Sequence, residues 1–261
     1  MRTVLIALAC MLIWSCGAPK EVTETKWIRL FNGTDLTGWD LKITGYPLNE
    51  NYKGIFSVED SILKVSYNNL DSFRGEFGHI FYKQPFSHYR LRIEYRFTGE
   101  QRPGGPDWAI RNSGVMLHSQ SAESMTLEQD FPVSIEAQFL GGLGEGERST
   151  LNVCTPGTDI DINGQMVEGH CTNSSSKTYQ GDQWVTAEIT VLGDSIIHHV
   201  IGGDTVLTYT HPRIGPEMKP EGFIIPDGTP LKDGYIALQA ESHNVEFRKV
   251  ELQDLSLSFK K

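Results

Sequence analysis

Two short segments of the sequence carry side chains that could transfer protons to and from a bound ligand. In SGVMLHS (residues 113–119), Val115 and Leu117 share one side of a strand and Met116 and His118 the other. In VSIEAQF (residues 133–139), apolar residues alternate with polar ones, among them Glu136 and Gln138. Because side chains alternate across a strand, each segment is predicted to be a strand with one core face and one polar face. A histidine, a carboxylate and an amide on one sheet surface indicate a polar ligand and acid–base chemistry. The alternative is an ordinary solvated sheet face.

Strands must hold these side chains in place, and short alternating runs recur along nearly the whole chain. Clusters of Gly, Asn, Asp and Pro separate the runs, and no long amphipathic helical period is present. Many short strands in one chain of this size predict an all-β sandwich or jelly roll. The expected strands are residues 55–58, 62–67, 79–82, 89–97, 114–118, 133–139, 185–192, 196–201, 205–209, 234–240 and 245–252.

The N-terminus has the pattern of an export signal. A basic start is followed by an apolar run at residues 4–14, which is too short to span a membrane as a helix. IWSCG (residues 13–17) resembles a bacterial lipobox, in which Cys16 would be lipidated. We therefore predict a signal peptide over residues 1–15, a polar tether over 16–26 and one domain over 27–261. The lipid would anchor this domain in the periplasm or at the outer membrane; a plain secretory signal is the alternative.

The remaining cysteines agree with export. Cys154 and Cys171 lie in a Gly-, Ser- and Thr-rich stretch, residues 141–183, which we expect to be a long functional loop pinned over one face. An even pair of cysteines in an oxidising compartment predicts a disulfide, worth on the order of 3 kcal/mol. A zinc site that also uses His170 is disfavoured, because the spacing of these residues is not that of a CxxC motif.

Charge and motifs exclude two classes of function. The net charge of −10 and the pI near 5.3 argue against a nucleic-acid-binding surface, since such a surface needs clustered Lys and Arg. The sequence contains no P-loop and no GxGxxG motif followed by a helix, so no nucleotide cofactor is indicated.

Polar faces recur on other predicted strands. Arg92 lies on the polar side of residues 90–97, and Tyr235 and Gln239 share one side of residues 234–239. Such side chains hydrogen-bond sugar hydroxyls, and an exposed aromatic residue such as Trp108 can stack on a pyranose ring. The pattern favours a carbohydrate ligand, although strand-to-strand ion pairs are the alternative role for an arginine.

A series of motifs in order along residues 27–255 resembles one known family. The opening LFNGTDLTGW (residues 30–39) is similar to the F-N-G-x-D-L-x-G-W start of the DUF1080 family, also called the 3-keto-disaccharide hydrolase domain. The closing VEFRKV (residues 245–250) resembles the final strand of that family, with Lys249 where Asn is usual. The matches between them are FSVEDSIL (56–63), YRLRIEY (89–95), RNSGV (111–115), IEAQ (135–138) and GYIALQ (234–239).

The resemblance implies a concanavalin-like jelly roll of two antiparallel sheets, in which the concave sheet forms a carbohydrate cleft. Members of the family resemble enzymes that cleave a glycoside after a separate sugar 3-dehydrogenase has oxidised it at C3. The ketone acidifies the C2 proton, so a base can remove it and the enolate can expel the group at C1. The predicted activity is therefore cleavage of 3-keto-glycosides, by elimination or by net hydrolysis. A non-catalytic, lectin-like carbohydrate-binding module on the cell surface is the alternative.

These roles map onto residues of the two opening segments and their surroundings. Glu136 and His118 are the predicted base and acid, and Arg111 is predicted to stabilise charge. A divalent metal held by Glu136 and His118, with His79 or His170, is the alternative electrophile. Double displacement is disfavoured, because residues 136–140 (EAQFL) lack the second carboxylate that retaining jelly-roll glycosidases carry on this strand. The predicted substrate-binding residues are Gln138, Arg92, Gln239, Tyr235 and Trp108.

Overall fold

The structure is a computed structural model that describes residues 26–259. The predicted signal peptide, the lipidation site at Cys16 and nearly all of the tether lie outside the described residues, so they stay predictions. Among the helices of the described part, none is long and apolar enough to cross a membrane.

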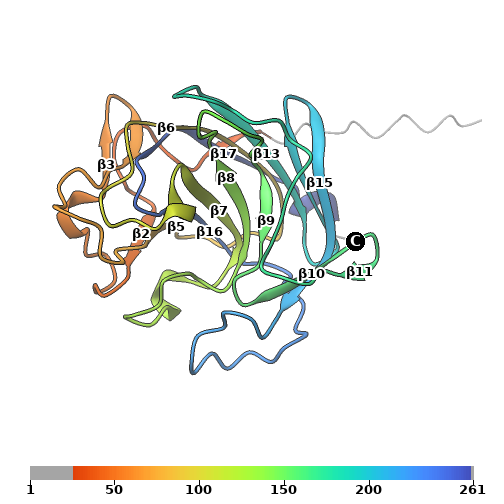
Figure 1. Cartoon of the computed structure of the whole chain (residues 1–261). Helices are drawn as coiled ribbons and strands as arrows, with labels where there is room; N and C mark the ends of the chain where they lie inside the picture. The colour runs from red at the N-terminus through yellow and green to blue at the C-terminus, as the bar shows by residue number, and fades with distance from the viewer. Residues whose placement is uncertain (1–25, 260–261) are drawn as a thin grey trace, which may run out of the picture.

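Two antiparallel sheets form the molecule (Figure 1). The ten-stranded sheet has the order β11-β10-β15-β14-β13-β6-β17-β4-β3, with β1 paired to β17. Its strands are β1 (Ile28–Arg29), β3 (Phe56–Glu59), β4 (Ile62–Val65), β6 (His88–Phe97), β10 (Thr158–Ile162), β11 (Gln165–Met166), β13 (Val185–Leu192), β14 (Ile196–Ile201), β15 (Asp204–Ile214) and β17 (Val245–Asp254).

The seven-stranded sheet has the order β12-β9-β8-β7-β16-β5-β2. Its strands are β2 (Trp39–Ile43), β5 (Gly78–Tyr82), β7 (Asn112–Ser119), β8 (Ile135–Leu140), β9 (Asn152–Cys154), β12 (Cys171–Thr172) and β16 (Tyr235–Ala240). Helical structure is limited to the short elements η1 (Tyr52–Gly54), η2 (Asp107–Ala109), η3 (Ala122–Ser124) and α1 (Ser256–Phe259). The predicted all-β sandwich is confirmed.

The main apolar core lies between the sheets and follows the alternation of the strands. Ile93 of β6 and Ala137 of β8 belong to this core, and the ring of Tyr95 in β6 stacks on that of Phe139 in β8 with centroids 4.1 Å apart. Burying apolar side chains at every second position holds each strand in register, because a slip of one residue would expose the whole set.

The outward positions of β6 form ion pairs with neighbouring strands. Arg92, which was predicted to bind substrate, lies on this outer face: its Nε donates to Glu188 at 2.7 Å and its Nη1 to Glu251 at 2.9 Å. The guanidinium also lies over the ring of Trp27. Arg92 therefore ties three strands of the ten-stranded sheet together, and this sheet contributes no strand residue to the cavity described below.

The predicted disulfide is present. Cys154 in β9 and Cys171 in β12 are joined across an antiparallel pair of strands. The bond closes part of the stretch that was predicted to be a pinned loop, and that stretch forms β9 to β12 on the way.

Removing this bond is expected to destabilise the domain. For a sequence separation of 17 residues, the Cys154→Ser/Cys171→Ser double variant should lose about 3 kcal/mol of unfolding free energy, which lowers Tm by about 6–12 °C. Thermal unfolding followed by circular dichroism measures this change. Added reductant should lower the Tm of the wild type and leave that of the double variant unchanged; equal Tm values for the two proteins would contradict the expectation.

Candidate functional site

A cavity of about 470 Å³ lies on the face of the seven-stranded sheet that points away from the core. This volume is within the range of sites for small ligands. The cavity is lined by Trp108, Asn112, Phe131, Glu136, Gln138, Leu140, Arg148, Cys154, Pro156, His170, Cys171, Met218 and Glu241. Strands β7, β8 and β9 supply its floor, and loops that follow or precede them supply its walls.

Two buried carboxyl groups belong to this cavity. Glu136 in β8 is 6% exposed, and Glu241, which directly follows β16, is 3% exposed. Oε1 of Glu136 and Oε2 of Glu241 have no hydrogen-bond partner among the described residues. Burial raises the pKa of Glu136 to about 8. Burial also raises the pKa of Glu241 well above its ordinary value, and the charge of Glu136 raises it further. At neutral pH the pair therefore retains protons.

The second carboxyl group was missed in the sequence. Residues 136–140 lack another carboxylate, and the structure supplies one from β16, which is separated from β8 only by β7. Glu241 continues the alternation of Gln239 on its strand, two residues further on. Extending the period-two pattern of residues 234–239 by one step could have found it.

Further buried amide and imidazole groups without partners lie on β5, β7 and β16 of the same sheet. Both amide atoms of Gln239, both ring nitrogens of His79 and Oδ1 of Asn112 lack hydrogen-bond partners among the described residues. Gln239 and His79 are paired residues on β16 and β5, and burial lowers the pKa of His79 to about 3, so its ring is neutral. Buried polar atoms are rarely left unpaired in folded proteins. Of the three residues, Asn112 lines the cavity, so a polar ligand there could pair with its Oδ1 atom.

Gly114 has no side chain and so leaves space for the side chain of Glu136. A Cβ atom at position 114 would lie 2.3 Å from Oε1 of Glu136 and 2.8 Å from its Cγ. The neighbouring Ser113 donates a hydrogen bond from Oγ to the carbonyl of Gln239 at 2.9 Å and so joins β7 to β16. The NSG segment at residues 112–114 thus shapes the cavity floor at three successive positions.

Gly114→Ala is expected to displace the Glu136 carboxyl group while leaving the backbone in place, because the atoms that the new Cβ would meet all belong to the Glu136 side chain. Displacement of the carboxyl group from its position should lower kcat/KM by about 10²-fold. Kinetics of the single variant, together with its Tm, test this. In a Glu136→Gln background the same change should cause little further loss; wild-type kinetics for Gly114→Ala would contradict the role of this glycine.

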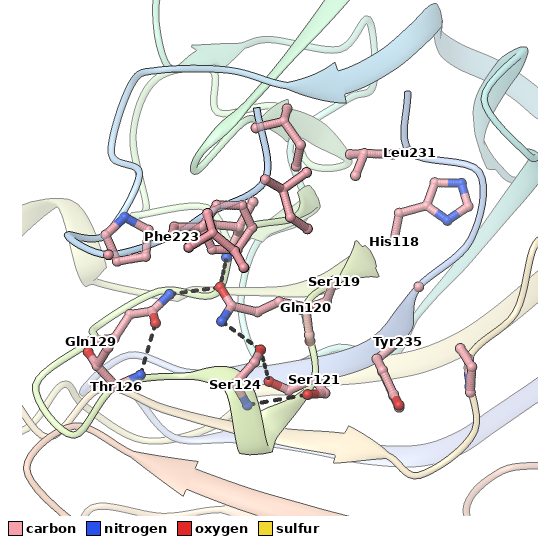
Figure 2. A pocket seen from close by; sticks show the side chains of 18 of the residues that line it. His118, Ser119, Gln120, Ser121, Ser124, Thr126, Gln129, Phe223, Leu231 and Tyr235 are labelled. Atoms are coloured by element: carbon pink, nitrogen blue, oxygen red, sulfur yellow. Dashed lines mark hydrogen bonds between the residues drawn. The ribbon is translucent and has the colours of Figure 1, made fainter. Parts of the chain in front are cut away.

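His118 is not brought together with Glu136. The pairing of β16 with β7 shifts at a bulge between Tyr235 and Ala237, and His118 has φ 48°. The bulge breaks the strand alternation. The ring therefore packs against Tyr89 of the opposite sheet, with Nε2 3.1 Å from the carbonyl oxygen of Gly193. His118 and Tyr235 line a second, neighbouring cavity instead (Figure 2).

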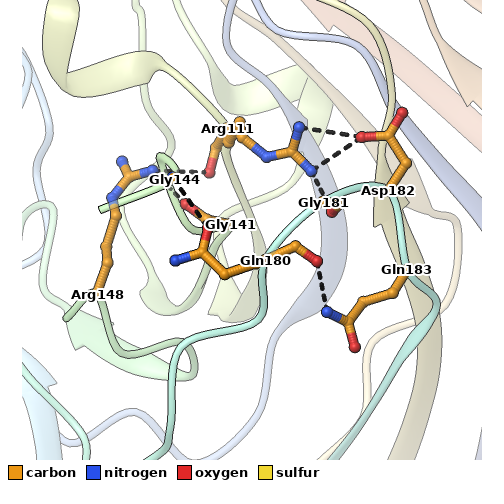
Figure 3. A network of polar contacts seen from close by, with 8 residues as sticks. All are labelled: Arg111, Gly141, Gly144, Arg148, Gln180, Gly181, Asp182 and Gln183. Atoms are coloured by element: carbon orange, nitrogen blue, oxygen red, sulfur yellow. Dashed lines mark hydrogen bonds and ion pairs between the residues drawn. The ribbon is translucent and has the colours of Figure 1, made fainter. Parts of the chain in front are cut away.

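Arg111 is engaged outside the cavity (Figure 3). Its guanidinium donates to Asp182 at 3.1 Å and to the carbonyl of Gly181. Arg148, and not Arg111, lines the cavity. Its Nη1 donates to the carbonyls of Ile110 and Gly141, both at 2.7 Å. Arg148 lies in an irregular, Gly-rich segment with no alternation, so no pattern pointed to it.

Two of the predicted substrate-binding residues, Trp108 and Gln138, line the cavity. The ring of Trp108 is 52% exposed and stacks on Phe77 with centroids 5.8 Å apart, which leaves its other face free for a ligand. Oε1 of Gln138 accepts a hydrogen bond from Asn152 at 3.2 Å. Gln239 is absent from the lining, and its buried amide has no hydrogen-bond partner among the described residues.

The metal-binding set considered from the sequence is not assembled. Glu136, His118, His79 and His170 do not converge; within residues 26–259 the one group of three such side chains with ligand atoms within 4.8 Å is Cys154, His170 and Cys171. Its two sulfur atoms form the disulfide, and a disulfide lacks the thiolates that bind zinc.

Comparison with solved structures supports the fold described above. The chain is similar to two crystal structures of a "putative glycosyl hydrolase" from Parabacteroides distasonis ATCC 8503. One is 16% identical with a TM-score of 0.51 and covers 88% of this chain and 100% of its own. The other is 17% identical with a TM-score of 0.50 and covers 88% and 94%. At these identities the likeness shows the fold alone. No curated protein matches the chain.

A family model described as "3-keto-alpha-glucoside-1,2-lyase-like domain" matches residues 26–253. This range contains every strand of both sheets except the last residue of β17. It also contains both buried glutamates and the cavity that they line. The match connects the chain with glycosides. The chain belongs to the 3-keto-alpha-glucoside-1,2-lyase-like domain family.

Proposed function

We propose that this protein cleaves the glycosidic bond of 3-keto-glycosides, and that it begins by removing the proton at C2 of the oxidised sugar. The buried pair Glu136 and Glu241, in a ligand-sized cavity, carries this proposal. Two carboxyl groups with raised pKa values can hold one proton and accept another near neutral pH, as an elimination requires. The family match supports the same chemistry.

The reaction balances with these two groups. The ketone at C3 acidifies the C2–H bond, and the carboxylate of Glu136 takes this proton. The electron pair of the C2–H bond forms the enolate, which collapses to a C1–C2 double bond as the C1–O bond breaks. The leaving oxygen takes a proton from neutral Glu241. The products are an alcohol and a 2-hydroxyglycal ketone; addition of water to the double bond gives net hydrolysis.

Other groups at the cavity would bind the oxidised sugar. The guanidinium of Arg148, which lines the cavity, is a hydrogen-bond donor for the developing enolate oxygen. The exposed face of Trp108 can stack on the pyranose ring. The substrate would come from a sugar 3-dehydrogenase, and the lipobox at Cys16 would place the domain in the periplasm or at the outer membrane.

Incubation with 3-keto-trehalose and 3-keto-glucosides tests the proposed function. We expect released glucose or alcohol and a 2-hydroxyglycal product, with no release from the same sugars before oxidation. A protein that only binds carbohydrate would retain the oxidised sugars unchanged. Binding without turnover at any pH between 6 and 9 would therefore contradict the proposed activity and favour a carbohydrate-binding module.

The Glu241→Gln variant tests the proposed role of Glu241 as the acid independently of the role of Glu136 as the base. An amide cannot give a proton to the leaving oxygen, so we expect kcat/KM to fall by about 10²-fold for a methyl 3-keto-glucoside. A 4-nitrophenyl 3-keto-glucoside, whose leaving group departs without a proton, should lose far less. Parallel kinetics with both substrates measure the difference; equal losses would remove Glu241 from the acid role.

A further inference from the structure

The second cavity, with a volume of about 630 Å³, lies beside the first. Two segments contribute to both: Phe131 and Met218 line the first cavity, whereas Val133 and Pro220 line the second. The Cα atoms of residues two apart in a chain lie no more than about 7 Å from each other. The two cavities are therefore close enough for one ligand to reach from the first into the second.

Three polar side chains of the second cavity, those of Gln120, Ser124 and Gln129, are hydrogen-bonded in a row. Gln120 donates to Ser124 at 2.9 Å, and Gln129 donates to Gln120 at 2.9 Å and accepts from the amide of Thr126 at 3.2 Å. Oε1 of Gln120 also accepts from the amide of Val133 at 2.8 Å. Figure 2 shows this row below Phe223. The row stiffens the loop between β7 and β8 and leaves little hydrogen-bonding capacity for a sugar.

The rest of the lining includes two carboxyl groups, those of Glu221 and Asp233, and a larger apolar wall that stays uncovered. It is formed by Val133, Ile214, Phe223, Ile224, Ile225 and Leu231. Ile224 is 91% exposed and Ile225 42%, and Met218 at the rim of the first cavity is 47% exposed. Large apolar side chains gathered at one place on a surface mark a binding site. Most of those here come from one segment, residues 215–227, which passes over both cavities.

We infer that the second cavity holds the leaving group of the substrate, and that this leaving group is a bulky apolar alcohol such as an aryl alcohol. This inference rests on the proposed function, because it places the oxidised sugar over Glu136 and Glu241. The sugar ring takes the hydrogen-bonding cavity and the aglycone takes the apolar one. Tyr235, Glu221 and Asp233, which also line the second cavity, offer polar groups that can hydrogen-bond a substituted ring.

Phe223→Ala tests the inference through substrate preference. The substrates are 4-nitrophenyl and methyl 3-keto-glucosides, each as both anomers. We expect kcat/KM to fall about 10-fold for the aryl substrate, because a buried ring contact is lost, and less than 2-fold for the methyl substrate. Leu127→Ala is the matched control, since Leu127 is 50% exposed and lines neither cavity. An unchanged aryl-to-methyl ratio would overturn the inference.

A binding measurement separates this inference from the proposed function. We expect 2-naphthol to bind to the wild type and to Glu136→Gln in isothermal titration calorimetry, and to bind about 10-fold more weakly to Phe223→Ala. If neither substrate is turned over while 2-naphthol still binds in this pattern, the proposed function fails and the apolar site stands. If 2-naphthol does not bind, the inference fails. Should Phe223→Ala not fold, Ile224→Ser provides the same comparison at an exposed position.

Discussion

Glu136→Gln is expected to lower kcat/KM for a 3-keto-glucoside by about 10³-fold, since a general base contributes roughly 10²–10⁴-fold. The amide has the shape of the carboxylate but cannot accept the C2 proton. The floor of the cavity should otherwise be unchanged, because Oε1 of Glu136 makes no hydrogen bond within residues 26–259 that the substitution could break. Release of 4-nitrophenol from a 4-nitrophenyl 3-keto-glucoside measures the rate.

The matched control is Glu123→Gln, at an exposed glutamate in η3 that lines neither cavity. It should retain wild-type kinetics. In the wild type, kcat/KM should rise with pH through an apparent pKa near 8, because Glu136 must be ionised to act and burial raises its pKa to about 8. This rise should be absent in Glu136→Gln. A variant that keeps more than a tenth of wild-type activity would exclude Glu136 as the base.

The same substitution is expected to stabilise the fold in alkaline solution. The pKa of Glu136 is raised from 4.5 to about 8 by burial, so the folded state keeps a proton that the unfolded state loses. Its contribution to stability is fully present below about pH 4.5 and is lost as the pH rises through 8. A pKa shift of this size corresponds to a loss of unfolding free energy of at most roughly 3–5 kcal/mol. Glutamine avoids this loss, because it cannot ionise.

Differential scanning calorimetry between pH 5 and pH 9 measures this effect. Near pH 5 the Tm of Glu136→Gln should be close to that of the wild type, and at pH 9 it should be higher by about 10 °C. Glu123→Gln, as the exposed control, should follow the wild-type curve throughout. A difference in Tm that does not grow with pH would show that Glu136 ionises in the folded state as readily as in the unfolded state.

The strands and their faces could be predicted from the sequence because alternation is a local property. The runs at residues 89–97 and 133–139 correspond to β6 and β8, and Glu136 lies on the polar side of β8 as expected. Periodicity does not say which polar face meets a ligand. The outward residues of β6 form ion pairs on the surface, whereas Glu136 and Gln138 line a cavity.

The errors in the predicted site have non-local causes. His118 was placed by alternation, but a bulge turns it toward Tyr89. Arg111 forms its ion pair with Asp182, which is 71 residues away in the sequence. Glu241 comes to Glu136 through the order of β8, β7 and β16, and strand order cannot be obtained from periodicity. The family resemblance supplied the chemistry, while only the fold could say which side chains are near one another.

Backbone hydrogen bonds hold together the two ends of the segment over the cavities, residues 215–227. Ile214 donates to the carbonyl of Thr229 at 2.9 Å and accepts from the amide of Gly228 at 2.8 Å, so the segment leaves and rejoins the sheet at nearly one point. Changing the length of a loop closed in this way costs little free energy. Insertions and deletions within residues 215–227 can therefore accumulate during evolution without disturbing β8 or β16. Under the proposed function, a change in the length of this segment would alter which leaving group is accepted and would leave Glu136 and Glu241 in place.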